Sequence, residues 1–153
     1  MSSVPRAWTR DGYEITSDRA RIDVNAVHRF LSEDAYWARD IPREVVELSI
    51  RHSLCFAILR GDGLVGFARV ISDRATFAYL GDVFVLPAHR GKGLSKWLME
   101  CIGSHADLQG LRRWILATAD AHGLYAQFGF SPLKAPPRWM EKHDPDVYTK
   151  SKR

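Results

Sequence analysis

The sequence predicts a single α/β domain, and two observations carry this prediction. Apolar residues recur in an order of strands and helices that is roughly β-α-α-β-β-β-α-β-α-β, with no internal repeat, linker or low-complexity tract. The chain has 153 residues, of which 46% are hydrophobic and 26% charged, so it can bury a substantial core without disulfide or metal staples. We therefore expect a central sheet of about six to seven strands flanked by about four helices.

The first predicted elements are a short strand and two helices. The strand covers residues 13–16. Apolar residues between 22 and 31 recur at helical spacing, and Asp23 or Asn25 is suited to cap that helix. A second helix is expected over residues 43–51.

A hairpin and a long strand come next. Strands over residues 53–59 and 64–71 flank the sequence Arg-Gly-Asp-Gly at 60–63, which is a strong turn signal. The apolar run over residues 75–85 indicates a strand that is buried on both faces.

Two helices and two strands complete the predicted order. Apolar residues from 94 to 102 recur at helical spacing, and a strand is expected over 112–118. Asp120 is suited to cap a short helix over 121–128, and a last strand is expected over 139–142.

Composition narrows the classes of function. The formal charge is +4, but basic residues are interleaved with acidic ones, whereas nucleic-acid readers usually carry a clustered basic stripe. Cys55 and Cys101 each lie in an apolar stretch and are expected in the core, and the six histidines show no metal-site spacing. Because Arg6, Arg10 and Asp11 interrupt any apolar leader, we expect a cytoplasmic protein with no membrane partner.

The run Val-Phe-Val-Leu-Pro-Ala-His-Arg-Gly-Lys-Gly-Leu-Ser at residues 83–95 is the most informative feature of the chain. It joins an apolar strand to a helix through a turn that contains two glycines and two basic residues, Arg90 and Lys92. Helix starts leave backbone N–H groups unpaired, and glycines allow a phosphate to approach them closely. The run therefore predicts a site for a phosphate-bearing cofactor.

A second motif makes the pattern specific. The turn Arg-Gly-Lys-Gly-Leu at 90–94 is followed, one strand later, by Leu-Tyr-Ala-Gln-Phe-Gly-Phe at 124–130, and together they resemble the GCN5-related N-acetyltransferase (GNAT) family. The resemblance covers about residues 12–142 and implies a single N-acetyltransferase domain over 1–153. It also implies a mixed central sheet in which one pair of strands splays apart.

The resemblance implies that acetyl-CoA is the cosubstrate and that no metal takes part. The family's pyrophosphate-binding segment corresponds here to Arg90, Gly91, Lys92, Gly93, Leu94 and Ser95. Ser95 stands where the family has glycine or alanine, and its hydroxyl could bond either a phosphate oxygen or the preceding turn of its helix. The backbone of Phe84, Val85 and Leu86 would line the splayed gap, with the N–H of Val85 or Phe84 polarising the thioester carbonyl.

Three groups are candidates for proton transfer. Tyr125 falls at the family position whose phenol lies near the sulfur of CoA, although a core tyrosine would show the same pattern. Asp82 is the leading candidate for the base that deprotonates the acceptor amine. Asp120 and His122 form a second candidate group, with a helix cap and an exposed helix residue as the structural alternatives.

Acceptor recognition is expected to come from the first helices and the hairpins. Tyr36, Trp37, Arg69, Asp73 and Thr118 are candidates, because aromatic side chains near acids suit a cationic amine. The two aromatic residues are equally suited to the core, and Arg69 to a strand surface.

The leading hypothesis is an enzyme, either a monomer or a homodimer, that transfers an acetyl group to a primary amine of a small molecule or peptide by direct attack in a ternary complex. The alternative is a non-catalytic CoA-binding regulatory module that keeps the glycine turn. A small nucleic-acid binder is the third hypothesis, and it predicts steeply salt-dependent binding.

Overall fold

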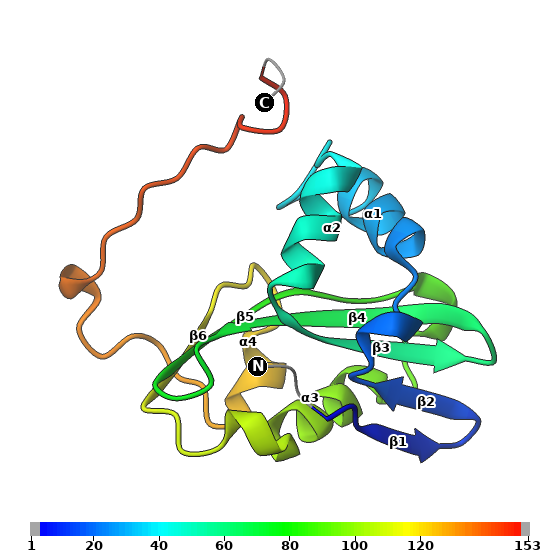
Figure 1. The fold of residues 1–153 in the computed structure, drawn as a ribbon. Coiled ribbons are helices and arrows are strands. Elements are labelled where there is room, and N and C mark those ends of the chain that lie inside the picture. The colour runs from blue at the N-terminus through cyan, green and yellow to red at the C-terminus, as the bar shows by residue number, and fades with distance from the viewer. Residues whose placement is uncertain (1–3, 151–153) are drawn as a thin grey trace.

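The computed structural model describes residues 4–150 as one six-stranded sheet with helices on both faces (Figure 1). The helices α1 and α2 lie over one face, and α3 and α4 lie over the other. The strands are β1 (Ala7–Arg10), β2 (Tyr13–Thr16), β3 (Leu54–Arg60), β4 (Gly63–Ser72), β5 (Phe77–Val85) and β6 (Arg113–Leu116). The α-helices are α1 (Val24–Glu33), α2 (Arg43–Arg51), α3 (Leu94–Ser104) and α4 (His122–Ala126), and short 3-10 helices include η2 (Pro87–His89) and η4 (Pro136–Arg138).

The sheet is mixed, as the resemblance to the GNAT family implied. Its strands follow chain order from β1 to β6, and every neighbouring pair is antiparallel except β5 and β6, which are parallel. These two strands pair only where residues 77–80 face residues 113–116. Beyond that point β5 continues to Val85 while β6 has ended, so the expected splayed pair is present.

Local signals explain most of the elements. Asp23 caps α1, because its Oδ1 accepts the Ala26 N–H at 3.1 Å. The strand β1 was not predicted: its sequence Ala-Trp-Thr-Arg lacks apolar alternation and is mostly exposed. It is held to β2 by a turn at Asp11 and Gly12, both of which have positive φ.

Two apolar clusters hold the layers together. The first lies between the sheet and the α3 and α4 layer, and the second lies between the sheet and the α1 and α2 layer. Cys101 belongs to the first and Cys55 to the second, so both cysteines are core residues as expected. Burial raises the pKa of each thiol to about 12, so both stay protonated at neutral pH.

The prediction of a strand over residues 139–142 is wrong. After η4 the backbone runs without regular pairing as an extended arm that crosses towards α2 (Figure 1). Pro136 and Pro137 fix the direction in which the chain leaves η4, and Met140 is 96% exposed. No strand within residues 4–150 therefore pairs with this segment.

The predicted cap of α4 is also wrong. Ala121 stands at the N-cap position, and no side chain caps the helix from there. The Thr118 Oγ1 accepts the Ala121 N–H at 3.0 Å, which is the kind of bond expected of Asp120. Asp120 is instead exposed.

No helix between residues 4 and 150 has both the length and the apolar character needed to cross a bilayer.

Candidate active site

The turn between β5 and α3 presents a row of unpaired backbone amides. Gly91 and Gly93 have φ of 77° and 76°, a conformation that L side chains rarely adopt, and Gly93 is the N-cap of α3 with no side-chain cap. Within residues 4–150, the N–H groups of residues 91–96 have no hydrogen-bond partner. A Cβ at either glycine would meet no atom within 4 Å, so the space in front of these amides is open. The turn can therefore receive an anion.

Two hydrogen bonds fix this turn to the sheet. The Arg90 Nε donates to the Val85 carbonyl at 2.8 Å, and the Tyr13 hydroxyl and the His89 Nδ1 are 2.9 Å apart. Sequence reasoning missed the pair of Tyr13 and His89, because the partners lie far apart in the chain. The available signal was the position of His89 beside Arg90 in the basic turn.

A small basic cavity of about 300 Å³ adjoins the start of α3. Two of its arginines are held against aromatic rings: the Arg10 guanidinium lies 5.0 Å from the Trp97 ring, and the Arg60 guanidinium lies 4.6 Å from the Tyr13 ring. The lining residues are Arg10, Asp11, Tyr13, Arg60, Lys92, Gly93, Leu94 and Trp97. Positive charge therefore extends from the turn towards β1 and β2.

The backbone of Val85 faces the splayed gap. The Leu86 N–H donates to the Val65 carbonyl at 2.8 Å, so Leu86 and, two residues earlier, Phe84 direct their amides towards β4. Successive residues of a strand alternate, so the N–H and carbonyl of Val85 point away from β4. The side chains of Phe84 and Val85 are both buried in the core.

Tyr125 lies on the inner side of α4. Its side chain is 7% exposed and meets Phe130 edge-on with ring centroids 6.0 Å apart. Burial, with a smaller contribution from the charge of Asp120, raises the pKa of the Tyr125 phenol above its usual value. Its hydroxyl forms no hydrogen bond with any residue between 4 and 150, so it is available to a ligand.

Asp82 is the centre of a polar network on the side of the sheet that carries α1 and α2. The Trp37 Nε1 donates to its Oδ1 at 2.8 Å, and the Arg69 Nε donates to its Oδ2 at 2.8 Å. Arg69 also donates to the Ser53 hydroxyl at 3.2 Å. Asp82 has φ of 54°, in the left-handed region, where the β4–β5 register shifts. Trp37 and Arg69 therefore fix the carboxylate, Ser53 fixes Arg69, and the strain lies in the backbone of Asp82.

The structure decides two of the alternatives for the acceptor residues. Tyr36 and Trp37 are 65% and 43% exposed, with ring centroids 5.1 Å apart, so they are not core aromatics. The Arg69 side chain is only 18% exposed and is paired with Asp82, so it is not a free surface residue. These residues lie together at the bulge of β5.

Other predicted site residues lie elsewhere. Asp73 shapes the turn between β4 and β5, where its carboxylate accepts the backbone N–H groups of residues 75–77 and the Thr76 hydroxyl. These bonds lower its pKa well below the usual range. That turn precedes β5, whereas the glycine turn follows it. His122 is exposed at the first position of α4.

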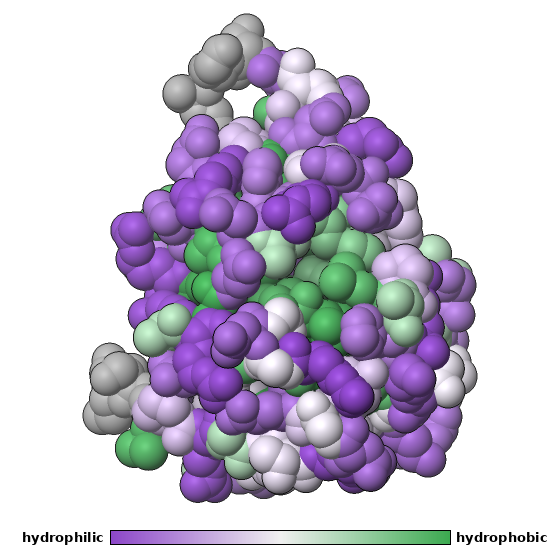
Figure 2. All heavy atoms as spheres, turned by 90° about the vertical axis from the view of Figure 1, so that its right-hand side faces the viewer, coloured by the Kyte–Doolittle hydropathy of each residue, from purple (hydrophilic) through white to green (hydrophobic). Residues whose placement is uncertain are grey.

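The surface beside the turn is hollowed and apolar at its centre. Figure 2 shows the face on which β5 ends, and apolar side chains gather there in a hollow framed by polar ones.

The described part of the chain brings together no group of three His, Cys, Asp or Glu side chains that could hold a metal ion. Ser95 has no side-chain hydrogen bond to another residue of the range 4–150, so its hydroxyl does not bond the preceding turn.

Comparisons with known proteins agree with this geometry. The family model described as an acetyltransferase (GNAT) domain matches residues 51–132, more than half of the chain. A candidate acetyltransferase from Gibberella zeae is 34% identical, over 80% of this chain and 81% of that protein. A candidate GNAT-family acetyltransferase from Xanthomonas campestris, whose crystal structure is known, is 52% identical with a TM-score of 0.89, over 93% of this chain and 100% of that one.

A more distant structure shares the fold alone. It is a predicted acetyltransferase from Clostridium acetobutylicum that was crystallised with acetyl-CoA, and it is 14% identical with a TM-score of 0.63, over 86% of this chain and 94% of that one. Together, the family match, the two closer relatives and the uncapped turn beside a splayed strand pair lead to one assignment. This chain belongs to the GNAT family of acetyltransferases.

Proposed function

We propose that this chain is a single N-acetyltransferase domain that transfers an acetyl group from acetyl-CoA to a primary amine of a small molecule or peptide. The observation that carries the proposal is the row of unpaired amides at residues 91–96, placed directly after the strand that parts from its neighbour. The presence of acetyl-CoA in the Clostridium acetobutylicum structure supports the choice of cosubstrate.

The turn and the gap suit the two ends of acetyl-CoA. Charge-assisted bonds from the amides of residues 91–96, with Arg90 and Lys92 nearby, would hold the pyrophosphate. The less polar pantetheine arm would then lie along β5, next to the apolar hollow (Figure 2). Of the two backbone donors considered from the sequence, Val85 is preferred over Phe84, because its N–H faces the gap. That N–H would polarise the thioester carbonyl.

The transfer requires one bond to form and one to break. The neutral amine nitrogen attacks the carbonyl carbon, the carbon–sulfur bond breaks, and the departing thiolate takes a proton. We assign that proton to Tyr125, because its hydroxyl has no competing partner among residues 4–150 and its raised pKa keeps it protonated at neutral pH. Direct attack in a ternary complex is favoured, since both substrates can meet in the gap beside Val85.

Asp82 is the proposed acceptor of the proton that leaves the amine. Each of its oxygens already accepts one bond, but a carboxylate has about four acceptor sites, so a further donor can be accommodated. Asp82 and the exposed rings of Tyr36 and Trp37 also offer the acidic and aromatic surroundings that attract an alkylammonium group. Arg69 would position the carboxylate rather than touch the amine.

Asp120 and His122 form a second group that could serve the acceptor. Both are exposed near α4, and the charge of Asp120 acts on Tyr125. They would reach an amine that enters from the α4 side of the gap. Replacing each in turn, and comparing KM for one amine against kcat, assigns the side of entry.

Two measurements test the proposal. Calorimetry with acetyl-CoA reports binding, and release of free thiol against a panel of primary amines reports transfer. We expect binding with thiol release for at least one amine class. Failure to bind acetyl-CoA would refute both the enzyme and the alternative of a CoA-binding regulatory module. Tight binding without thiol release across small and peptide amines would favour the module.

A further inference from the structure

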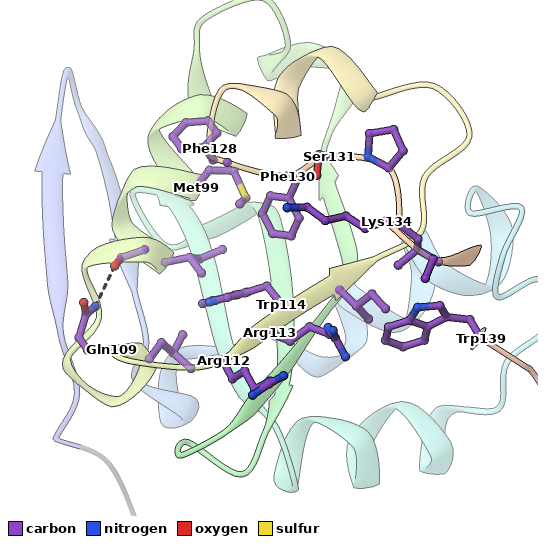
Figure 3. A pocket seen from close by; sticks show the side chains of 18 of the residues that line it. Met99, Gln109, Arg112, Arg113, Trp114, Phe128, Phe130, Ser131, Lys134 and Trp139 are labelled. Atoms are coloured by element: carbon purple, nitrogen blue, oxygen red, sulfur yellow. Dashed lines mark hydrogen bonds between the residues drawn. The ribbon is translucent and has the colours of Figure 1, made fainter. Parts of the chain in front are cut away.

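Two cavities of the described chain have neither Val85 nor Tyr125 in their lining. The larger, of about 1090 Å³, lies along the outer side of β6, where Figure 3 shows Arg112 and Arg113 near the strand and Lys134 across from them. Its basic side chains are therefore spread over opposite walls. The smaller, of about 300 Å³, is the basic cavity at the start of α3, and its volume is at the lower end of the range for small-ligand sites. Its cations come from β1, β3 and the glycine turn and meet at one place.

The smaller cavity lies on the side of the glycine turn that faces away from the splayed gap. The gap is between β5 and β6, whereas the cavity is lined from residues 10, 11, 13 and 60, at the ends of β1, β2 and β3. The strands follow chain order across the sheet and neighbours stand about 4.8 Å apart, so β3 is roughly 10 Å from β5 and β1 is farther still. A pantetheine arm along β5 therefore leaves the cavity unfilled, although the turn borders the cavity at Lys92 and Gly93.

Arg60 is held in place by its own chain before any ligand arrives. Its guanidinium lies 4.6 Å from the centre of the Tyr13 ring, and its Nη1 donates to the Asp11 carbonyl at 3.1 Å. A Cβ at Gly12 would come within 2.9 Å of Nη1, so the glycine leaves the room that the guanidinium occupies. The Nε and Nη2 groups have no acceptor among residues 4–150. A guanidinium that is already fixed, with N–H groups to spare, loses little conformational entropy when it binds an anion.

The other charged residues of the lining set the charge of the cavity. Arg10 lies 5.0 Å from the Trp97 ring and reaches Glu100 only at 3.4 Å. Lys92 is exposed and forms no ion pair with an acid between residues 4 and 150. Three cations against the single carboxylate of Asp11 give the lining a formal charge of +2. A phosphate monoester carries about −1.5 to −2 at pH 7 and has three strong acceptor oxygens, so it matches both the charge and the donors.

We propose that this cavity is a second anion site, separate from the amides of residues 91–96, and that it binds a phosphate monoester through Arg10, Arg60 and Lys92. The free Nε and Nη2 of Arg60 lie on one side of the guanidinium, which suits a bidentate bond to two phosphate oxygens. The phosphate has two sources, the 3′-phosphate of a bound CoA or a separate small molecule that carries the same group. The first source rests on the proposed function, whereas the second does not.

Calorimetry with inorganic phosphate, at constant ionic strength, tests the proposal on the full chain. The chain is first saturated with dephospho-CoA, which lacks the 3′-phosphate, so that the turn is already filled. We expect phosphate to bind this complex, and Arg60→Gln to weaken that binding at least about tenfold. The matched control is Arg29→Gln, which removes the same charge from an exposed position on α1, on the other face of the sheet from α3. It should leave the binding of phosphate unchanged.

Repeating the titration with CoA in place of dephospho-CoA identifies the source. Loss of phosphate binding, with CoA held more tightly than dephospho-CoA, would assign the cavity to the 3′-phosphate, and retained binding would assign it to a separate molecule. If the chain bound neither form of CoA, the proposed function would fail, and the same titration into the free chain would still test the cavity through Arg60→Gln. Absence of phosphate binding would refute the proposal. An equal loss in Arg60→Gln and Arg29→Gln would show only a general effect of charge and would also refute it.

Discussion

A methyl group at Gly93 tests whether the turn after β5 binds acetyl-CoA through its backbone. Gly93 has φ of 76°, and a Cβ there would meet no atom within 4 Å. Gly93→Ala therefore introduces no clash in the free protein. Its cost to folding comes from the left-handed backbone alone and should be about 1–2 kcal/mol.

Gly110 supplies a matched control. It is exposed, its φ is 72°, and a Cβ there would also meet no atom within 4 Å. Gly110→Ala should therefore lower the free energy of unfolding by the same amount as Gly93→Ala. It lies after α3, outside the turn. Any difference in acetyl-CoA affinity between the two variants then reports on the turn and not on stability.

The expected difference follows from the bonds at the start of α3. A methyl group at the N-cap occupies space that a phosphate needs in order to reach the neighbouring amides. Loss of one hydrogen bond to a charged group costs about 1.5–3 kcal/mol, which corresponds to a rise in Kd of roughly 10-fold to 150-fold. Calorimetry with acetyl-CoA measures Kd, and thermal unfolding verifies that the two variants are equally stable. Equal Kd values for the two variants would refute the assignment of the turn as the pyrophosphate site.

Three further predictions concern protonation. Tyr125→Phe should keep acetyl-CoA affinity but lower kcat by at most about 10²-fold, whereas the control Tyr79→Phe, on the paired part of β5, should leave kcat unchanged. Because the pKa of Tyr125 is raised, kcat of the parent enzyme should persist above pH 10. A fall in kcat at lower pH would contradict the assignment of Tyr125 as the acid. Asp82→Asn should lower kcat/KM most strongly near neutral pH, and the loss should become smaller at high pH, where the amine deprotonates by itself. An equal loss of kcat/KM at every pH would indicate that Asp82 positions the substrate rather than accepts its proton. Burial lowers the pKa of His105, so its contribution to stability is present above about pH 6.5 and is lost as pH falls, at no more than about 1.4 kcal/mol per pH unit. His105→Gln should therefore flatten the dependence of the unfolding free energy on pH, and equal profiles for the variant and the parent would contradict the reasoning.

The features that could be predicted from the sequence are those encoded locally. The first N–H groups of a helix have no partner within that helix, so the glycine turn before an amphipathic helix was enough to indicate residues 90–95 as a candidate anion site without a structure. Apolar periodicity likewise located α3 and the hairpin of β3 and β4. These signals depend on neighbours within a few residues.

The polar network around Asp82 could not be predicted in the same way. Trp37 is separated from Asp82 by a helix and two strands, and only the fold brings its indole N–H to that carboxylate. The side of the sheet that Asp82 faces depends on the bulge in β4 and β5, since one residue of shift reverses a strand side chain. Aromatic residues in a loop also carry no periodic signal, so exposure of Tyr36 could not be distinguished from burial.

The failed prediction of a strand over residues 139–142 has a different cause. A helix closes its hydrogen bonds within its own segment, so sequence pattern and propensity are enough to indicate where one forms. A strand exists only when another strand accepts and donates its bonds, and a local pattern does not specify that partner. Here the prolines of η4 carry Trp139–Lys142 away from the outer edge of β6, so the segment finds no strand to pair with among residues 4–150.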